Sequence, residues 1–83
     1  MSNISYQILF FNSTWCEPCK QVKKYLTEDL IKELNIKSLD ADENMEEFTK
    51  YQVASVPTFI KLVNGEEKFR QSGALSLEQL KNL

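Results

Sequence analysis

Histidine is absent from this sequence of 83 residues, and cysteine, proline and glycine occur only twice each. A zinc site at Cys16 and Cys19 would need ligands from a second chain, because structural zinc takes four protein ligands. A secreted mini-protein of this length usually carries a larger disulfide framework. A bridge across so short a loop would also remove little chain entropy from the unfolded state. Reactivity therefore explains the two cysteines better than a structural role does.

An excess of basic residues and a long apolar segment are also missing. Ten Lys and Arg stand against twelve Asp and Glu, which argues against non-specific binding to the phosphates of nucleic acids. No apolar run approaches the roughly 20 residues that span a bilayer. The first residues lack the basic start and the apolar stretch of a signal peptide. We expect no nucleic-acid or membrane partner, no bound metal and a cytoplasmic location.

The composition is that of one small globular domain. Hydrophobic residues make up 42% of the chain and charged residues of both signs make up 27%, which allows a modest core and does not indicate a disordered tail. Since 83 residues are too few for two separate cores, we expect a single domain spanning residues 1–83.

The first half of the sequence predicts two strands and two helices. Residues 4–11 contain a dense apolar run, which suits a central strand covered on both faces. Over residues 18–34 an apolar residue recurs at every fourth position, which predicts one amphipathic helix. These positions are Val22, Leu26, Leu30 and Leu34. Residues 36–41 predict a second strand, and residues 42–44 supply the start of a second helix. Its inward-facing side chains are Met45, Phe48 and Tyr51.

The end of the sequence predicts a β-hairpin and a last helix. Asn64 and Gly65 both tolerate positive φ in a two-residue turn, so they join strands over residues 57–63 and 66–71. Ser76 is placed to cap the final helix. The resulting order is βαβαββα, an α/β fold in which three helices flank a four-stranded mixed sheet on both faces.

Cys16 and Cys19 lie where the chain passes from the first strand into the first helix. Unpaired backbone N–H groups and the positive end of the helix dipole favour an anion there. Since the thiolate is the nucleophilic form of cysteine, this position should make Cys16 reactive. Cys19 follows one helical turn later on the same face, close enough to form a disulfide with Cys16. We predict that Cys16 attacks a substrate disulfide and that Cys19 then resolves the mixed disulfide.

The neighbours of the cysteines modify this prediction. Lys20 favours a thiolate at Cys16, and Glu17 opposes it. Pro18 limits the freedom of the loop and helps to hold the sulfurs in register. Trp15 offers an apolar surface that excludes water or contacts a substrate. Two plainer interpretations stay open, namely an inert cysteine pair and a Trp15 that is simply part of the core.

Several motifs resemble those of the thioredoxin family. Residues 15–20, Trp-Cys-Glu-Pro-Cys-Lys, resemble the family's Trp-Cys-Gly-Pro-Cys-Lys motif with Glu17 in place of glycine. Residues 53–59, Val-Ala-Ser-Val-Pro-Thr-Phe, resemble the family's stretch before and into its third core strand. Residues 64–66 and 73–76 also match in order and spacing. The similarity runs from about residue 8 to residue 83, and the motifs together are highly specific.

The resemblance implies a thioredoxin-like fold and an enzyme, a dithiol–disulfide oxidoreductase that reduces protein disulfides. Such an enzyme binds no cofactor and works through a redox-active Cys16–Cys19 disulfide. Its partners in electron transport would be protein disulfide substrates and a flavin-dependent disulfide reductase. We expect it to act as a monomer.

The resemblance also implies a substrate groove beside the cysteines. Pro57 would be a cis-proline, and the backbone of Val56 would pair with an extended substrate segment. Ser72 and Gly73 would line the groove, where glycine allows close approach of the backbone. Judged from the residues alone, a Pro57 that merely starts a strand in trans is the alternative.

The sequence departs from the family pattern in several places. Typical thioredoxins carry an additional strand and helix before the core. This sequence begins at the strand that leads to the cysteines, so we expect a minimal version of the fold, nearer in length to glutaredoxins. The family's buried aspartate, thought to assist deprotonation of the second cysteine, is Phe10 here. Asp40 and Asp42 are candidates to replace it, and the lysine usually paired with it falls near Lys37 or Ser38. We expect a stable fold with a slower resolving step, because apolar replacement of a buried ion pair can stabilise a protein.

Two other functions stay open. A glutaredoxin-like enzyme that uses glutathione is favoured by the chain length, although Trp15 and residues 73–76 look more like thioredoxin. A non-catalytic binding module would use the same groove to hold a partner protein without turnover.

Overall fold

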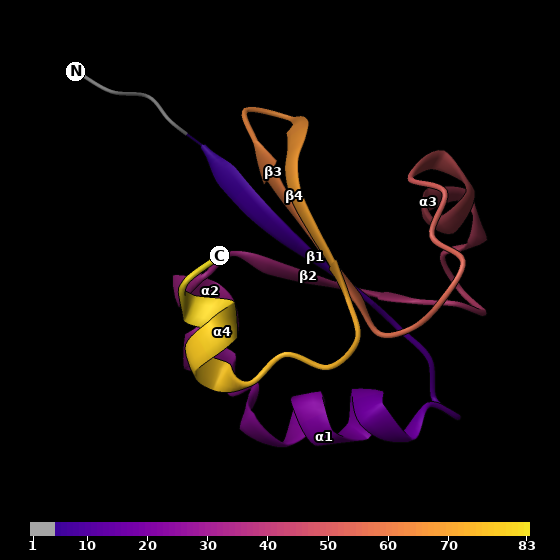
Figure 1. Ribbon diagram of the computed structural model, residues 1–83, viewed down its shortest axis with the longest axis horizontal. Coiled ribbons are helices and arrows are strands. Elements are labelled where there is room, and N and C mark those ends of the chain that lie inside the picture. Colours follow the sequence, from indigo (N-terminus) through magenta and orange to yellow (C-terminus); the bar gives the residue numbers. More distant parts are fainter. Residues whose placement is uncertain (1–4) are drawn as a thin grey trace.

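The computed structural model describes residues 5–83, which form a four-stranded sheet with helices on both faces (Figure 1). The strands are β1 (Tyr6–Asn12), β2 (Ile36–Asp40), β3 (Thr58–Val63) and β4 (Glu66–Ser72). Their order in the sheet is β2-β1-β3-β4. Strand β1 is parallel to β2 and antiparallel to β3, and β3 and β4 are antiparallel. The predicted mixed sheet is confirmed, and Ile4, the predicted start of the first strand, lies outside the described residues.

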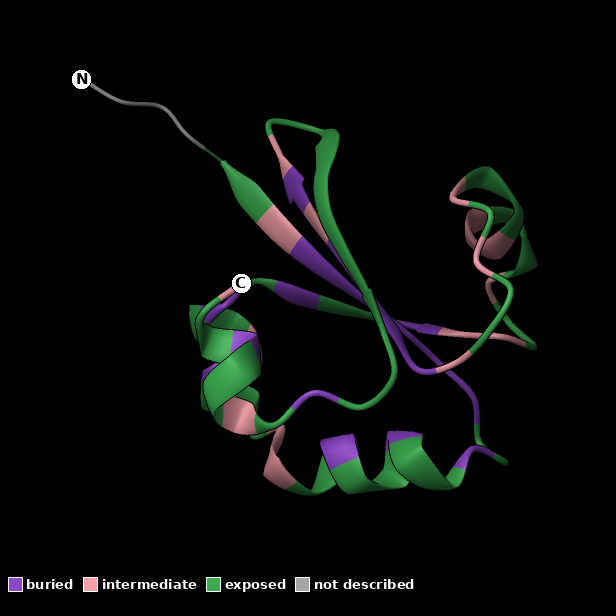
Figure 2. Cartoon of the chain, viewed as in Figure 1, coloured by how far each residue is buried: buried purple, intermediate pink, exposed green. Residues whose placement is uncertain are grey.

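The apolar run near the start of the chain forms the central strand β1. Its side chains alternate between the two faces of the sheet. Ile8 and Phe10 lie in one core cluster, and Leu9 and Phe11 lie in the other. All four are buried, and Figure 2 shows β1 buried along most of its length. The prediction of a central strand covered on both faces is confirmed.

Among residues 5–83, three helices cover one face of the sheet and one helix covers the other (Figure 1). The helices are α1 (Glu17–Tyr25), α2 (Glu28–Glu33), α3 (Met45–Lys50) and α4 (Leu77–Lys81). Val22 of α1, Leu30 of α2 and Leu80 of α4 belong to the cluster that contains Phe10. Phe48 of α3 packs against the other cluster. None of these four helices has the length and apolar composition needed to cross a membrane.

The helix predicted over residues 18–34 is in fact two helices, α1 and α2. The break lies at Leu26 and Thr27, which have extended backbone angles with ψ of 92° and 164°. The Thr27 hydroxyl accepts a hydrogen bond from Leu30 N at 3.1 Å, so Thr27 acts as the N-cap of α2. The apolar repeat continues across the break because both helices pack against the same core cluster. Periodicity therefore identified the side chains that face the core, with Leu26 half-buried and the other three buried, and it missed the break.

Helix α3 differs from the prediction at its first residue. Met45 is 69% exposed instead of facing inward, because it opens the helix just beyond the carboxyl end of β2. Phe48 and Tyr51 are half-buried as predicted, with ring centroids 4.9 and 6.0 Å from that of Phe11. Asn44 does not cap the helix with its side chain.

The β3–β4 hairpin and the last helix agree with the prediction. Asn64 and Gly65 have φ of 53° and 84°, which are the positive values that a two-residue hairpin turn requires. Ser76 caps α4 through a reciprocal pair of hydrogen bonds. Its Oγ accepts from Gln79 N at 3.1 Å, and Gln79 Oε1 accepts from Ser76 N at 2.9 Å.

Strand β4 contains a bulge that the sequence did not predict. Lys61 pairs with Phe69, whereas Leu62 pairs with Glu67. Lys68 is therefore an extra residue with no counterpart in β3. Because side chains alternate along a strand, this extra residue changes which face of the sheet the flanking side chains reach.

Candidate active site

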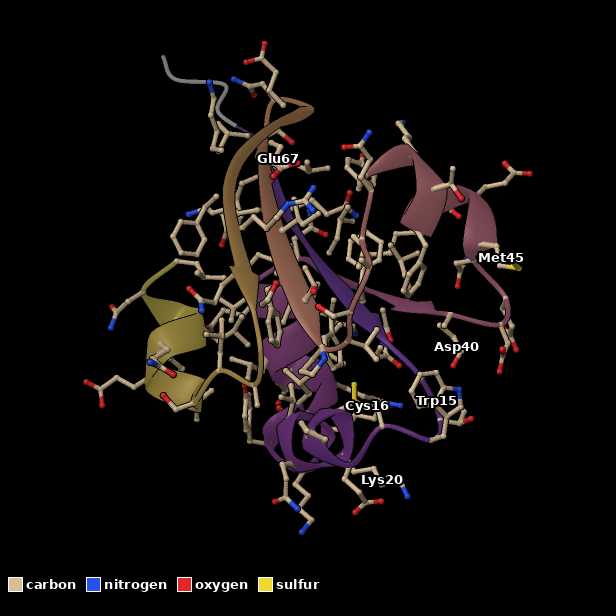
Figure 3. All side chains as sticks on the ribbon, turned by 45° about the vertical axis from the view of Figure 1, so that its right-hand side comes forward. Trp15, Cys16, Lys20, Asp40, Met45 and Glu67 are labelled. Atoms are coloured by element: carbon tan, nitrogen blue, oxygen red, sulfur yellow. A yellow bond between two sulfur atoms is a disulfide. The ribbon has the colours of Figure 1, made fainter. Side chains whose placement is uncertain are left out.

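The chain leaves β1 and enters α1 through a short passage that ends at Cys16 (Figure 3). Cys16 is the N-cap of α1, and its Sγ accepts a hydrogen bond from Cys19 N at 3.2 Å. Its carbonyl accepts a helical hydrogen bond from Lys20 N, also at 3.2 Å. A sulfur thus takes the place of the oxygen that usually caps a helix. The predicted position of Cys16 at a helix start is confirmed.

Cys16 and Cys19 form a disulfide, and their Cα atoms are 5.2 Å apart. Cys16 is 5% exposed, whereas Cys19 is fully buried in the cluster that contains Phe10. A thiol or disulfide of another molecule therefore reaches the Cys16 sulfur before that of Cys19. Pro18 lies in the first turn of α1 as predicted, where a missing N–H leaves no acceptor unpaired.

The two charged neighbours of the cysteines pair with each other. Lys20 Nζ lies 2.8 Å from Glu17 Oε2, and both side chains are largely exposed. Because the two charges have opposite signs, their electrostatic effects on Cys16 largely cancel. Solvent screens the small remaining effect. The helix start itself, with its inward-pointing N–H groups, is therefore the main source of positive potential at the sulfur.

Trp15 lies directly beside Cys16 on the surface (Figure 3). It is 67% exposed, so the interpretation of Trp15 as a core residue is wrong. A large apolar side chain that folding leaves in water is available for contact with another molecule.

The loop before β3 approaches the cysteines from a different part of the chain. Val56 packs against the cluster that contains both cysteines. The Val56–Pro57 peptide bond is cis, which confirms the expectation from the family resemblance and shows that the trans alternative is wrong. Thr58 Oγ1 donates to Ser55 O at 2.8 Å and closes the loop. Within residues 5–83, neither the backbone N–H nor the C=O of Val56 has a hydrogen-bond partner.

Ser72 and Gly73 lie next to this loop, at the end of β4. Ser72 pairs with Thr58 in the hairpin register. Gly73 has φ of 97°, a region that residues with a side chain rarely adopt. Its N–H donates to Pro57 O at 2.8 Å. The residues expected to line a groove therefore form one continuous stretch with Val56.

The position of the family's buried aspartate is filled by an aromatic ring. Phe10 is buried, and its ring stacks on Phe59 with centroids 4.9 Å apart. Its neighbour on β2 is Ser38, whereas Lys37 pairs with Leu9 and so belongs to the opposite face. The register therefore places Ser38, and not Lys37, at the family's lysine position. With Phe10 at the aspartate position, neither charge of the family's aspartate–lysine pair is present.

Of the two candidates to replace that aspartate, Asp40 uses its carboxylate in the turn before α3, and Asp42 takes part in that turn through its backbone N–H. Asp40 Oδ1 accepts from Asp42 N at 2.8 Å, and Asp40 N donates to Asn44 Oδ1 at 3.0 Å. Both contacts stabilise the turn before α3. Across residues 5–83, no group of three Cys, Asp or Glu side chains is arranged to hold a metal ion.

Sequence reasoning missed Asn12. This residue is 2% exposed, and its Nδ2 donates to Phe10 O and Ser38 Oγ at 2.9 Å and to Leu39 O at 3.3 Å. Asn12 thus joins the ends of β1 and β2 immediately before the cysteine loop. The sequence gives only a weak indication that Asn12 is buried, because an asparagine after an apolar run is most often a turn residue.

Tyr25 was also missed as a link between α1 and the segment after Gly73. Its hydroxyl donates to Leu75 O at 2.6 Å, and burial raises the pKa of Tyr25 above its usual value. The helix that carries the cysteines is therefore tied to the chain that follows β4.

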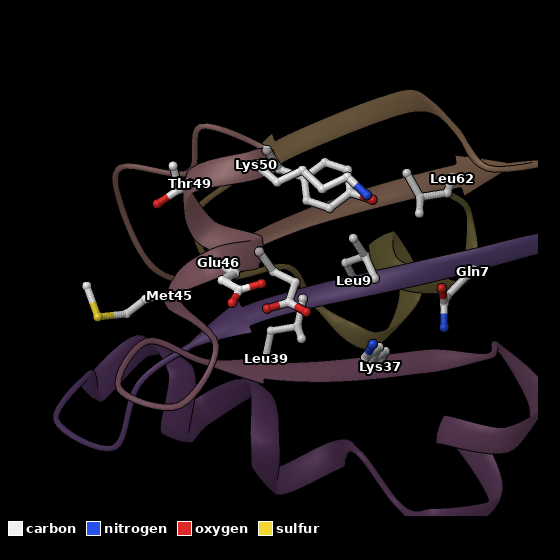
Figure 4. A pocket seen from close by; sticks show the side chains of 11 residues that line it. Gln7, Leu9, Lys37, Leu39, Met45, Glu46, Thr49, Lys50 and Leu62 are labelled. Atoms are coloured by element: carbon white, nitrogen blue, oxygen red, sulfur yellow. The ribbon is translucent and has the colours of Figure 1, made fainter.

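A hollow of about 690 Å³ lies on the α3 face of the sheet (Figure 4). Leu9, Leu39 and Leu62 line it from the sheet, and α3 forms one wall. Neither cysteine nor Pro57 lines this hollow. The geometry of the cysteines, rather than the size of this hollow, locates the candidate active site.

Comparisons with known proteins agree with this geometry. Residues 2–83 match the family model described as Thioredoxin. A thioredoxin of Staphylococcus aureus is 40% identical over 63 residues, which cover 72% of this chain and 61% of that protein.

Solved structures of thioredoxins are also similar. The thioredoxin of Fasciola hepatica gives a TM-score of 0.80 at 31% identity and covers 93% of this chain and 76% of that one. A mutant thioredoxin from Halobacterium salinarum gives 0.81 at 26% identity, covering 93% of this chain and 69% of that one. This chain spans 61% of the length of the staphylococcal thioredoxin that it matches. On the family match and this shared fold, the chain belongs to the thioredoxin family.

Proposed function

We propose that this chain is a thiol–disulfide oxidoreductase that reduces protein disulfides. The observation that carries the proposal is the arrangement of its two sulfurs. Cys16 Sγ receives the Cys19 N–H at a helix start, and Cys19 is buried within disulfide distance behind it. Relatives and neighbours whose names contain thioredoxin support the same chemistry.

The cycle begins with the reduced pair. The Cys16 thiolate attacks one sulfur of a substrate disulfide, so a bond forms between Cys16 and that sulfur while the substrate S–S bond breaks. The displaced substrate thiolate takes up a proton. Cys19 then gives up its proton to solvent, and its thiolate attacks Cys16 Sγ. The bond between Cys16 and the substrate sulfur breaks, and the second substrate thiolate leaves and takes up a proton. Two electrons have passed to the substrate, and the Cys16–Cys19 disulfide remains.

The helix start favours the first step. The Cys19 N–H already points at Cys16 Sγ, so a negative charge on this sulfur receives a hydrogen bond and the helix dipole without rearrangement. The second step lacks such help, because Phe10 stands where the family has a carboxylate. We therefore propose that resolution of the mixed disulfide is the slower step.

Substrate binding involves Trp15 and the Val56 loop. The Val56 backbone has no hydrogen-bond partner among residues 5–83, so it is suited to pair with an extended substrate segment. Exposed Trp15 supplies an apolar contact beside the reacting sulfur. Ser72 and Gly73 would border the bound segment, where the absent side chain of Gly73 leaves room for a substrate backbone.

The remaining parts of the proposal concern the cellular setting. A flavin-dependent disulfide reductase returns two electrons to the Cys16–Cys19 disulfide, so the chain needs no bound cofactor. A reducing compartment such as the cytoplasm suits a pair that must be kept as a dithiol. We propose that residues 1–83 act as one domain and as a monomer.

An insulin-reduction assay tests the proposed function. The full chain at catalytic concentration should accelerate the reduction of insulin disulfides by dithiothreitol, and a double variant with Cys16→Ser and Cys19→Ser should not. Redox titration of the cysteine couple in the same preparation gives its potential. A wild-type rate equal to dithiothreitol alone would contradict the proposal and leave the binding-module interpretation.

A second arm of the assay uses glutathione and glutathione reductase as the only source of electrons. We expect little turnover with glutathione and full turnover with dithiothreitol. Efficient turnover with glutathione would instead identify a glutaredoxin-like enzyme.

A further inference from the structure

The side chain of Arg70 connects β4 to the end of α3. Its Nε and Nη2 donate to the two carboxylate oxygens of Glu67 at 2.8 and 2.9 Å. Nη2 also donates to Tyr51 O at 2.5 Å, and Nη1 donates to Gln52 O at 3.5 Å. This bidentate contact with Glu67 fixes the plane of the guanidinium group. An ion pair with a single hydrogen bond would not fix it.

The bulge at Lys68 makes this pair possible. Residues three apart in a regular strand point to opposite faces of the sheet. In β4 the bulge shifts the register, so that Glu67 pairs with Leu62 and Arg70 pairs with Ile60. Leu62 and Ile60 both belong to the core cluster on the α3 face. Glu67 and Arg70 therefore reach that face together.

The carbonyls that Arg70 binds lie at the C-terminal end of α3. Tyr51 is the C-cap of this helix, and carbonyls at a helix end lack helical donors and attract cations. Gln52 follows with φ of 53°, and Val53 N donates back to Phe48 O at 2.9 Å. Arg70 thus fixes the point from which the loop to β3 departs.

Strand β4 and the residue that follows it, Gly73, hold this loop, residues 53–57, at both ends. The first end follows the carbonyls bound by Arg70, and the other end is Pro57, whose carbonyl accepts from Gly73 N at 2.8 Å. Between these anchors, Val56 has an unpaired backbone within the described chain. A loop that is already ordered loses less conformational entropy when it pairs with a substrate strand.

We propose that Arg70, oriented by Glu67 through the Lys68 bulge, is a positioning residue for substrate binding. It orders the loop that presents the Val56 backbone, and it contacts neither the cysteines nor the substrate. The inference rests on the proposed function, because it assigns the Val56 backbone to binding of extended protein substrates. It further implies that small disulfides, which have no strand to pair, do not depend on Arg70.

The test compares Arg70→Ala with a matched control on the same strand. Lys68→Ala removes a cation that pairs with Glu66 at 3.2 Å on the exposed edge and reaches no helix end. Arg70→Lys keeps the positive charge and removes the planar guanidinium group, which makes the bidentate contact. Kinetics of the full chain are measured with insulin and with cystamine, and the potential of the cysteine couple is titrated.

We expect Arg70→Ala to raise the KM for insulin by about three- to tenfold, with kcat within about twofold of wild type. Cystamine reduction and the redox potential should not change. Arg70→Lys should show most of the same rise, and Lys68→Ala should show none. A KM for insulin that is unchanged in Arg70→Ala, fully restored in Arg70→Lys or equally raised in Lys68→Ala overturns the inference.

Amide hydrogen exchange supplies a readout that does not depend on activity. Exchange at Val53, whose N–H bonds to Phe48 O, should be faster in Arg70→Ala and unchanged in Lys68→Ala. Unchanged exchange in Arg70→Ala overturns the inference even if that variant is less active. A wild-type chain that reduces neither disulfide refutes the proposed function instead, and the exchange comparison still decides whether Arg70 orders the loop.

Discussion

The cysteine segment and the Val56 loop meet at one end of the molecule but are held there in different ways. Cys16 and Cys19 are positioned by the first turn of their own helix and by the core behind it. The loop that carries Val56 is held by Arg70 of β4 on one side and by Gly73, just after β4, on the other. The reactive part is therefore built from neighbours in the sequence, and the binding part from residues far apart in it.

This difference separates reactivity from recognition. A change within the cysteine segment should alter the chemical steps for every disulfide, whether small or large. A change in the supports of the Val56 loop should alter the binding of protein substrates and leave the chemistry of small disulfides intact. The predictions below test this separation.

The largest effect is expected from the cysteines themselves. Cys16→Ser should abolish turnover of both insulin and cystamine, because the attacking sulfur is gone. Cys19→Ser should also stop turnover, yet it should accumulate a mixed disulfide with Cys16, since only the resolving thiol is missing. Mass spectrometry under non-reducing conditions detects the trapped species. A mixed disulfide that formed equally in Cys16→Ser would contradict the assigned order of attack.

Phe10→Asp should combine a large loss of stability with a faster resolving step. The substitution removes an aromatic stack with Phe59 and buries a carboxylate, which should lower the free energy of unfolding by about 3–5 kcal/mol. The new carboxylate lies in the cluster with Cys19 and accepts its proton. Urea unfolding and the lifetime of the mixed disulfide measure the two effects.

Two companion variants complete this test. Phe10→Leu keeps an apolar side chain and should not shorten the lifetime. Ser38→Lys, which the register places beside Phe10, should restore part of the stability of Phe10→Asp by pairing with the carboxylate. A lifetime that is the same in folded Phe10→Asp and in Phe10→Leu would refute the explanation of slow resolution.

Gly73→Ala should affect binding more than chemistry. Gly73 has φ of 97° and Gly65 has φ of 84°, and a Cβ at either position would meet no atom of the described residues within 4 Å. Each alanine variant should therefore lose about 1–2 kcal/mol of stability from backbone strain alone. Only Gly73→Ala should raise the KM for insulin, because only Gly73 bonds to Pro57. An equal rise in Gly65→Ala, at the distant hairpin turn, would show that general destabilisation is responsible.

The smallest effect is a pH dependence of the Arg70 contact. Hydrogen bonds from Arg70 lower the pKa of Glu67 below its usual value of 4.5. The resulting stabilisation is complete above that value and is lost as the pH falls through the lowered pKa. Since the pair is about one-third exposed, solvent limits its contribution to less than about 1 kcal/mol. Thermal unfolding of wild type and Glu67→Gln should converge in acid, and a constant difference would argue against the pair.

Sequence reasoning succeeded where a feature depends on neighbouring residues. The helix start at Cys16, the turn at Asn64 and Gly65, and the central position of β1 all follow from local patterns. The family resemblance supplied the cis bond before Pro57, which local patterns alone did not favour. The break at Thr27 was missed because the apolar repeat reports which side chains are buried, and both helices bury theirs in one core.

Features that depend on the pairing of distant segments were not predicted. The buried position of Asn12 requires the register between β1 and β2, and the contact of Arg70 with Tyr51 requires the bulge in β4. Met45 was expected to be buried because its spacing fits an inward face, but the first turn of α3 extends past the sheet. A sequence pattern does not contain this information, because it does not show how far each neighbouring element reaches.

The bulge at Lys68 has a second consequence, which concerns self-association. Strand β4 is one of the two outer strands of the sheet, and all seven of its residues are exposed. A straight edge of this kind offers its backbone to the same edge of another copy and so promotes aggregation. The extra residue bends the edge, and the charged side chains along the strand would have to lose water if another strand paired there. We expect the protein to resist edge-to-edge stacking at high concentration while the Val56 backbone stays available to foreign strands.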